Sequence, residues 1–510
     1  MFDKFTRRVG SFTAGTLISR ILGLIRESVF AYLFGAGFAT DAFQVAFRIP
    51  NLFRDLFAES ALSSAFVPTF VDNLVKKDRK EVWRFASNVF NTLFIVVGVI
   101  VVLGMIFAPA LVKVLAYGFK EVSGKQELTS TLTRIMLPFL LFVALASWAM
   151  GVLNAFKDFF LPALAPALFN LGSVLVAIFS YRYFVNHNYE PILGMAYGVT
   201  IGACFQFLIQ IPSLIKKGFK YSFYVNFKDP ELRRVLMLWI PTILGLASYQ
   251  INFAVNTFLV TFLEERSITY LNYAYRIMHL PAGLFGVAVG SVAIAEFSSK
   301  VAEETSEVLK EQLRHALKLV SLLTLPISAL FLALAIPITR IIYEHGKFTP
   351  QDTLYTAQAL MLYAPGIFAQ AGVRSIAACF YALKDTKTPA LVGLSIVVVN
   401  FLINRSLMTV IGFRTFPLAT SLCAFLNFGI LSYFLKKKIG SWGSAQINRV
   451  VLLTFCYAVI SAIISFWVFS LLSKKILAFN FINQLITLGI SGIIGLGIFF
   501  GLVSISKITF

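Results

Sequence analysis

The first long apolar stretch of the chain is SFTAGTLISRILGLIRESVFAYLF, residues 11–34. At a rise of about 1.5 Å per residue, it is long enough to cross a hydrocarbon core of about 30 Å as a helix. Arg20 and Arg26 lie about 14 Å and about 22 Å from its start, too deep to reach the surface easily. An arginine at such a depth costs about 2.5–3.5 kcal/mol unless it faces a bundle interior or a wet cavity. The stretch therefore predicts a membrane-spanning helix beside a polar space.

The composition extends this interpretation to the whole chain. Hydrophobic residues make up 58% of it, charged residues only 13%, and the mean hydropathy is +0.81, whereas soluble domains average about 25% charged residues. We therefore expect an all-α polytopic membrane protein with fourteen transmembrane helices. Their expected ranges are 11–34, 41–67, 87–116, 130–154, 161–184, 191–215, 234–262, 268–296, 316–343, 353–383, 389–411, 415–435, 449–473 and 480–505.

Lysine and arginine residues between these spans indicate the orientation. With the N-terminus inside, about 23 of them lie in cytoplasmic segments and about 8 outside, so the positive-inside rule places both termini in the cytoplasm. The net charge of +20 then reflects topology, membrane lipid headgroups and a cationic cavity, and needs no nucleic-acid partner. The basic stretch 71–84 is expected to lie on the inner membrane surface as an amphipathic segment.

The chain also repeats itself at a spacing of about 228 residues. Residues 46–49 (AFRI) match 274–277 (AYRI), and 154–158 (NAFKD) match 381–385 (YALKD). Repeats in the same orientation predict two pseudo-symmetric six-helix lobes with a substrate site between them. The expected domains are 1–215 (helices 1–6), 216–440 (helices 7–12) and two extra C-terminal helices at 441–510.

Deep cations and one polar helix face define the candidate site. Arg54 lies about 20 Å along the second span and Arg276 about 14 Å along the eighth, so they join Arg20 and Arg26 as candidate substrate-binding residues. The second span also carries a polar stripe on one helix face, expected to line a cavity: Arg48, Asn51, Asp55 and Glu59. The alternative is a set of structural ion pairs, as between Arg26 and Glu27, although Arg20 has no acid nearby in its own helix.

The sequence carries no signature of catalysis. It contains no GxxxxGK[ST], HExxH or GxSxG motif, and its four cysteines have no CxxC spacing. We therefore expect a transporter and not an enzyme, with no cofactor and no metal.

A series of short segments along the whole chain has a more specific pattern: SRILGLIRE (19–27), FGAG (34–37), TDAF (40–43), PNLFR (50–54), FAE (57–59), SAFVP (64–68), QIN (250–252), YEHGKF (343–348) and KDTKTP (384–389). This pattern closely resembles the MurJ/MviN family of lipid II flippases, in the multidrug/oligosaccharidyl-lipid/polysaccharide exporter superfamily. The resemblance implies two six-helix lobes around a V-shaped cavity, with helices 13 and 14 forming a groove for a lipid tail.

The resemblance also implies a cargo and its binding residues. The family moves lipid II, the undecaprenyl-pyrophosphate-linked disaccharide-pentapeptide precursor of peptidoglycan, from the inner to the outer leaflet of the bacterial cytoplasmic membrane. Its cavity arginines map onto Arg20, Arg26, Arg54 and Arg276, and its polar positions onto Asp41, Arg48 and Glu59. Guanidinium groups suit this cargo because they bind phosphate oxygens in a fork. Peptidoglycan-synthesis enzymes are an alternative further set of binding partners.

Some positions depart from the family pattern. Asn256 and Asn404 stand where some members have carboxylates suited to sodium, so sodium coupling is not expected and the membrane potential is the favoured drive. Tyr275 and His279 stand near Arg276 in place of an acid; His279 is either a proton-coupling residue or a packed one. Three alternative functions remain: a flippase for another polyprenyl-linked oligosaccharide, an ion-coupled multidrug exporter, and a non-transporting scaffold.

Overall fold

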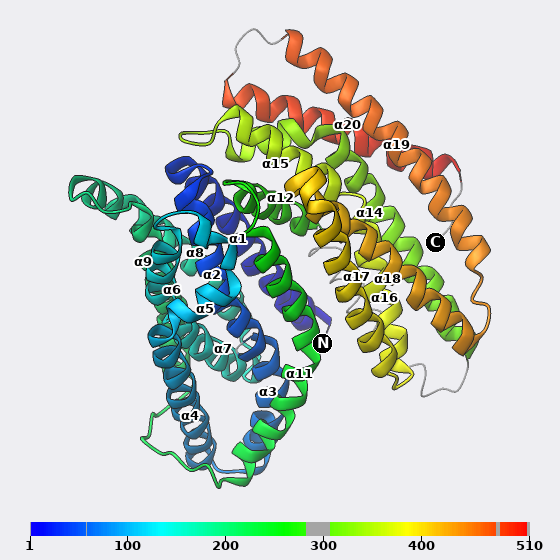
Figure 1. Cartoon of the computed structure of the whole chain (residues 1–510). Coiled ribbons are helices and arrows are strands. Elements are labelled where there is room, and N and C mark those ends of the chain that lie inside the picture. Colours follow the sequence, from blue (N-terminus) through cyan, green and yellow to red (C-terminus); the bar gives the residue numbers. More distant parts are fainter. Residues whose placement is uncertain (1, 58, 282–305, 476–479, 507–510) are drawn as a thin grey trace. The chain divides into compact units, whose positions relative to one another are not determined.

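The computed structural model describes residues 2–57, 59–281, 306–475 and 480–506, and within these ranges the chain forms helices joined by turns, with no β-strand (Figure 1). The expected all-α class is confirmed. Packing divides the chain into two compact units, Met1–Arg266 and Ser267–Phe510. The seventh predicted span packs within the first unit. The expected lobes at 1–215, 216–440 and 441–510 rest on the sequence repeat and stay a prediction.

Unit 1 is built from helices whose ends follow proline, glycine and charge signals. α7 begins directly after Pro138, and Pro212 lies in the first turn of α10. Proline is tolerated there because a backbone N–H in the first turn has no hydrogen-bond partner within the helix. The helices are α1 (Phe2–Phe34), α2 (Phe38–Phe57), α3 (Glu59–Lys76), α4 (Arg79–Ile106), α5 (Ala108–Leu115), η1 (Tyr117–Glu121), α6 (Lys125–Met136), α7 (Phe139–Ala155), α8 (Phe160–Asn186), α9 (Ile192–Leu208), α10 (Ile211–Lys216) and α11 (Pro230–Val260).

The basic stretch 71–84 is not the single surface segment that we expected. α3 ends at Lys76 and α4 begins at Arg79, because Asp78 is extended and starts a new helix. Lys77 forms an ion pair with Glu231 at the start of α11. The turn therefore ends one helix, begins the next and holds α11.

α1 packs closely along α8. A Cβ atom on Gly15 would lie 3.0 Å from the Cβ of Ala163, so only a residue without a side chain allows this approach. One turn further on, Asn170 donates a hydrogen bond to the carbonyl of Ser19 at 3.2 Å. These contacts fix the rotation of α1 against α8.

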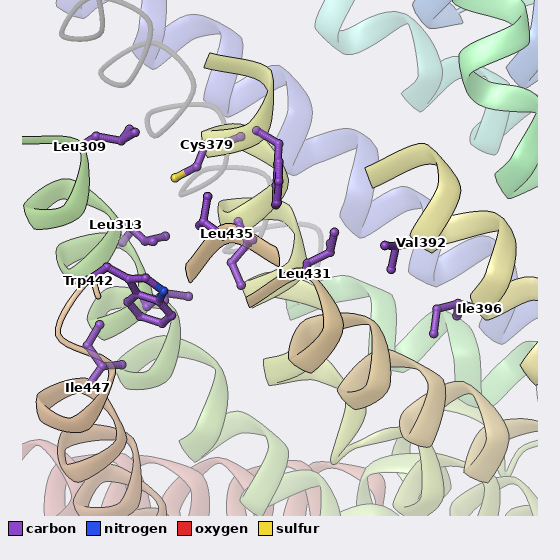
Figure 2. Packing of buried hydrophobic residues seen from close by; sticks show 14 of the residues in the cluster. Leu309, Leu313, Cys379, Val392, Ile396, Leu431, Leu435, Trp442 and Ile447 are labelled. Carbon is purple, nitrogen blue, oxygen red and sulfur yellow. The ribbon is translucent and has the colours of Figure 1, made fainter. Parts of the chain in front are cut away.

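Unit 2 is held by two hydrophobic clusters. One joins α14, α16, α17, α18 and the start of α19, with Leu313, Cys379 and Leu435 at its centre (Figure 2). The other packs α14 and α16 against α19 and α20 around Phe499. The helices are α12 (Ser267–Pro281), α14 (Ser306–Tyr343), α15 (Pro350–Tyr363), α16 (Gly366–Ala382), α17 (Lys387–Ile411), η3 (Gly412–Arg414), α18 (Thr415–Ile439), α19 (Ser444–Lys475) and α20 (Phe481–Ile505).

Eight runs among the described residues are long and apolar enough to cross a membrane by length and composition. One of them, Lys387–Ile439, contains two helices that we predicted as separate spans, 389–411 and 415–435. A multi-pass membrane protein is thereby supported, while the number fourteen stays a prediction. The second part of the predicted span 268–296 lies outside the described residues.

The internal repeat has a counterpart in the backbone. Lys157 and Lys384, at the same place in the matching segments, both adopt left-handed φ angles, 62° and 58°. The backbone N–H of the following residue, Asp158 or Asp385, donates to the carbonyl five residues earlier, at 3.0 Å and 2.8 Å. This is the hydrogen bond of a Schellman turn at a helix C-terminus. The matching segments of the two units therefore end in the same turn, which unit 1 also forms at Asn188 and Gly218.

Candidate functional site

α1 presents its two arginines in different environments. Arg26 is buried, pairs with Glu27 at 2.6 Å and lies over the ring of Phe169 in α8 at 5.2 Å. Arg20 is only partly buried, six residues earlier, which places it about 120° away around the helix. Within the part of the chain that the structure describes, the Arg20 side chain has neither an ion pair nor a hydrogen bond. The structural ion-pair alternative thus describes Arg26 and not Arg20.

α2 carries the predicted polar stripe. The Arg48 guanidinium donates to the hydroxyl of Thr257 at 2.6 Å and lies over the ring of Phe253 at 4.3 Å, so it is held against α11. Asn51 donates to the carbonyl one turn earlier at 2.8 Å, which leaves its side-chain oxygen as an acceptor. Arg54 lies partly buried in the last turn of α2.

Two members of that stripe cannot be compared with the structure. The side chains of Asp55 and Glu59 lie outside the described residues. Their place on the cavity face stays a prediction.

Asp41, at the start of α2, is the centre of a buried polar cluster. Its carboxylate pairs with Lys125 of α6 at 3.3 Å and accepts the backbone N–H of Arg266 at 2.8 Å. The Lys125 ammonium also lies over the rings of Phe119 and Phe38, at 4.5 Å and 5.6 Å. The two charged side chains are 1% and 3% exposed, so Asp41 has a fixed protein partner here. Burial of a charge is tolerated because it is paired and hydrogen-bonded.

The fourth predicted arginine lies in unit 2. Arg276 is partly buried on α12 and stands in the sequence between Tyr275 and His279. The rings of Tyr275 and His279 are 4.1 Å apart, and Tyr275 also contacts Tyr363 of α15 at 5.8 Å. His279 therefore packs against an aromatic ring, in agreement with the alternative that it is a packed residue. The structure brings three of the four arginines into unit 1 and one into unit 2.

The two positions weighed as sodium ligands bond to other asparagines. Asn404 is fully buried and donates to Asn400 at 3.0 Å, and Asn256 lies 3.5 Å from the side-chain oxygen of Asn252. Among the residues that the structure describes, no three His, Cys, Asp or Glu side chains come together as metal ligands do.

Sequence reasoning missed two cations. Lys125 lies between the predicted spans 87–116 and 130–154, and no local signal in the sequence shows that it pairs with a carboxylate 84 positions away. Arg374 lies partly buried in the apolar helix α16. The same signal that picked out the four arginines, a cation within an apolar run, would have found it.

The helical architecture and its long apolar helices define a class, that of multi-pass α-helical membrane proteins. The chain is similar to an inward-facing MATE family transporter of the MOP superfamily, with a TM-score of 0.64 over 85% of this chain and 95% of that one. At 14% sequence identity this similarity concerns the fold alone.

Closer comparisons define the family. The family model described as lipid II flippase MurJ matches residues 30–487. A probable lipid II flippase MurJ of Buchnera aphidicola subsp. Schizaphis graminum is 33% identical over 424 residues, 83% of this chain and 82% of the relative. One from Rickettsia prowazekii is 32% identical over 499 residues, covering 97% and 96%. A solved structure, lipid II flippase MurJ in an inward closed conformation, has a TM-score of 0.77 at 28% identity, covering 97% of this chain and 98% of that one.

The chain therefore belongs to the MurJ family of lipid II flippases. The resemblance found in the short segments is confirmed. The family consists of transporters and not of enzymes, and it belongs to peptidoglycan biosynthesis. The chain is thus a multi-pass protein of the bacterial inner membrane.

Proposed function

We propose that this chain moves lipid II from the inner to the outer leaflet of the cytoplasmic membrane by alternating access. In the proposed cycle, an inward-open cavity binds the pyrophosphate on Arg20, Arg26, Arg54 and Arg276. The lobes then rock, and the sugar-peptide head crosses while the prenyl tail stays in lipid beside residues 441–510. Membership of the family supports the cargo, and the deep arginines supply charges that match a diphosphate.

The proposal includes the topology derived from the sequence: fourteen spans, two six-helix repeats in parallel orientation, and both termini in the cytoplasm. The repeated turn at Lys157 and Lys384 supports the duplication, because both copies have the same backbone conformation and hydrogen bond. Asp41, Arg48, Asn51, Asp55 and Glu59 are proposed to shape the polar surface next to the arginines, with Asp41 acting through its ion pair to Lys125.

The observation that carries the proposal is the difference between the two arginines of α1. Arg26 is neutralised by its neighbour Glu27, whereas Arg20 has no side-chain partner within the described residues. A guanidinium in an apolar helix without a counter-charge is costly. An anionic cargo removes that cost when it binds, and this gives Arg20 a reason to be retained where it lies.

Replacement of Arg20 tests the proposal. We expect Arg20→Ala to lose complementation of a strain depleted of its own lipid II flippase, and Arg20→Lys to keep part of it because ammonium binds phosphate without the fork. Binding of lipid II to the purified variant should weaken about 10- to 100-fold, the value of one or two charge-assisted hydrogen bonds. Arg134→Ala is the matched control, because Arg134 is exposed and donates only to the carbonyl of Met105.

The outcomes distinguish the alternatives. If Arg20→Ala is present at the wild-type level and still exposes lipid II on the outer leaflet, the role of the arginine is wrong. If the wild-type chain itself does not complement but binds another polyprenyl-pyrophosphate glycan, the cargo is a different lipid-linked oligosaccharide. If it moves organic cations instead, it is a multidrug exporter.

A further inference from the structure

The segment that joins α10 to α11, residues 219–229, is not helical, contains a turn at residues 227–228 and is hydrogen-bonded to α4; we refer to it as the strap. Asn226 and Asn88 bond reciprocally: the backbone N–H of Asn226 donates to the Asn88 side chain at 2.8 Å, and the Asn88 amide donates to the Asn226 carbonyl at 3.1 Å. The N–H of Ser222 donates to the hydroxyl of Ser87 at 3.2 Å. The strap therefore has side-chain partners in place of a neighbouring β-strand.

The same face of α4 bonds the rest of the strap. The Asn91 amide donates to the carbonyls of Ser222 and Tyr224, at 3.2 Å and 3.0 Å, and the guanidinium of Arg84 lies 4.0 Å from the centre of the Tyr224 ring. The α4 residues involved are at positions 84, 87, 88 and 91, the spacing of a single helix face. The backbone groups of Ser222, Tyr224 and Asn226 are thus turned toward α4, and the Tyr221 hydroxyl also donates to the Asn91 side chain at 2.9 Å.

Both ends of the strap are fixed. The ring of Phe219 packs against Trp83 and Trp148, with centroids 5.5 Å and 5.4 Å apart. At the other end, the carboxylate of Asp229 accepts the backbone N–H of Glu231 at 2.9 Å and caps α11. The strap therefore has a defined outer face.

That outer face is aromatic and basic. Phe223 is 86% exposed and Phe227 is 51% exposed, and the exposed lysines Lys220 and Lys228 lie at the two ends of the pair. Two exposed phenylalanines flanked by lysines suit an apolar medium with negative charge at its border.

We propose that the outer face of the strap is a binding site for acidic phospholipids. Phe223 and Phe227 enter the boundary between headgroups and acyl chains, where aromatic side chains are favoured. Lys220 and Lys228 contact lipid phosphates, as basic residues beside a membrane span do at an anionic surface. The orientation given under the proposed function places this site in the cytoplasmic leaflet. The site itself does not depend on which cargo is moved.

Photocrosslinking on the full-length protein tests this assignment. p-Benzoylphenylalanine is placed at Phe223 in one variant and at Phe219 in another, and each is reconstituted in vesicles of phosphatidylglycerol and phosphatidylcholine. We expect lipid adducts at position 223, enriched in phosphatidylglycerol above its mole fraction. The matched variant at position 219 should give crosslinks only within the protein, because Phe219 packs against Trp83 and Trp148.

The lysines are tested in the same assay. Lys220→Gln with Lys228→Gln should lower the preference for phosphatidylglycerol roughly fivefold per lysine while adducts still form. Absence of lipid adducts at position 223, or adducts only to another protein, would overturn the proposal. So would equal labelling of the two lipids by the crosslinker at position 223 in the variant that keeps both lysines. Complementation by the wild-type chain is measured separately, so failure of this site leaves the flippase proposal standing.

Discussion

The turn after α7 in unit 1 and the turn after α16 in unit 2 have the same backbone but differ in the bonding of their aspartates. Among the residues that the structure describes, Asp158 forms one ion-pair contact, to Lys217, at 3.9 Å. Asp385 accepts the ammonium of Lys438 at 2.7 Å, and also the backbone N–H and the hydroxyl of Thr388, at 3.0 Å and 2.9 Å. The two turns therefore share the helix-ending hydrogen bond and differ at the start of the following helix.

One residue accounts for part of the difference. Thr388 stands three positions after Asp385, where its amide and hydroxyl both reach the carboxylate. The corresponding residue after Asp158 is Leu161, which has no hydroxyl. The Asp385 carboxylate therefore accepts an N–H of the first turn of α17, although the N-cap residues of α17 and α8, Thr386 and Phe159, form no side-chain cap. Capping and a charge-assisted bond each stabilise a helix start by about 1 kcal/mol or more.

The largest expected effect follows from removing each carboxylate. Asp385→Ala should lower the free energy of unfolding by about 1–2 kcal/mol, because it loses a cap and a bond to Lys438. Asp158→Ala should cost less than about 0.5 kcal/mol, because a long and partly exposed ion pair contributes little. Thermal unfolding of the two purified full-length variants in the same detergent measures the difference. Equal losses would show that the two turns are energetically alike.

A smaller effect is expected from the left-handed lysines. Lys157→Gly and Lys384→Gly should each stabilise the protein by about 1 kcal/mol, since left-handed backbone is strained for a residue with a Cβ and free of strain for glycine. The gain should be the same at both turns, because their φ angles are within a few degrees. Lys→Ala at the same positions is the control that leaves the strain in place. A gain at only one turn would mean that the similar backbones are held by different forces.

The sequence predicted the helices best where apolar runs end at proline or glycine. α8 and α17 begin and end within two residues of the predicted spans 161–184 and 389–411. α4 was predicted poorly: it starts at Arg79 and not at residue 87, because a helix that continues beyond the bilayer is no longer marked by hydropathy. The strap was passed over because its alternation of polar and aromatic residues is short and lies between two longer apolar runs.

The sequence predicted the members of the candidate site that single residues indicate, and it did not predict the contacts between them. A cation in an apolar run identifies Arg20 and Arg26 without any structure, because the cost of burial is a property of the residue and its depth. Their partners are a property of the fold. That Arg26 packs on Phe169, and that Lys125 lies against Asp41, depends on contacts between helices far apart in the sequence.

The smallest expected effect is on the stability that the protein loses as the pH falls. The hydrogen bond from Lys438, with that from the Thr388 amide, lowers the pKa of Asp385 from 3.8 to about 2. A carboxyl whose pKa is lower in the folded state stabilises the protein above its unfolded pKa, and this contribution is lost as the pH falls from about 4 to about 2. Lys438→Gln removes the largest cause, so the pKa of Asp385 should rise toward 3.8 and the acid-dependent contribution should shrink. The change is small because the Lys438 side chain is 40% exposed and water screens the pair.

The unfolding midpoint of the wild-type chain, Lys438→Gln and Asp385→Asn between about pH 5 and pH 2 measures this contribution. Asp385→Asn has no carboxyl at this position and defines the acid dependence that comes from all other groups. The wild type should lose stability relative to Asp385→Asn as the pH falls, and Lys438→Gln should lie between the two. If the wild type and Asp385→Asn lose stability in parallel as the pH falls, the bonds of Asp385 to Lys438 and Thr388 do not lower its pKa. The two turns would then differ in geometry but not in electrostatics.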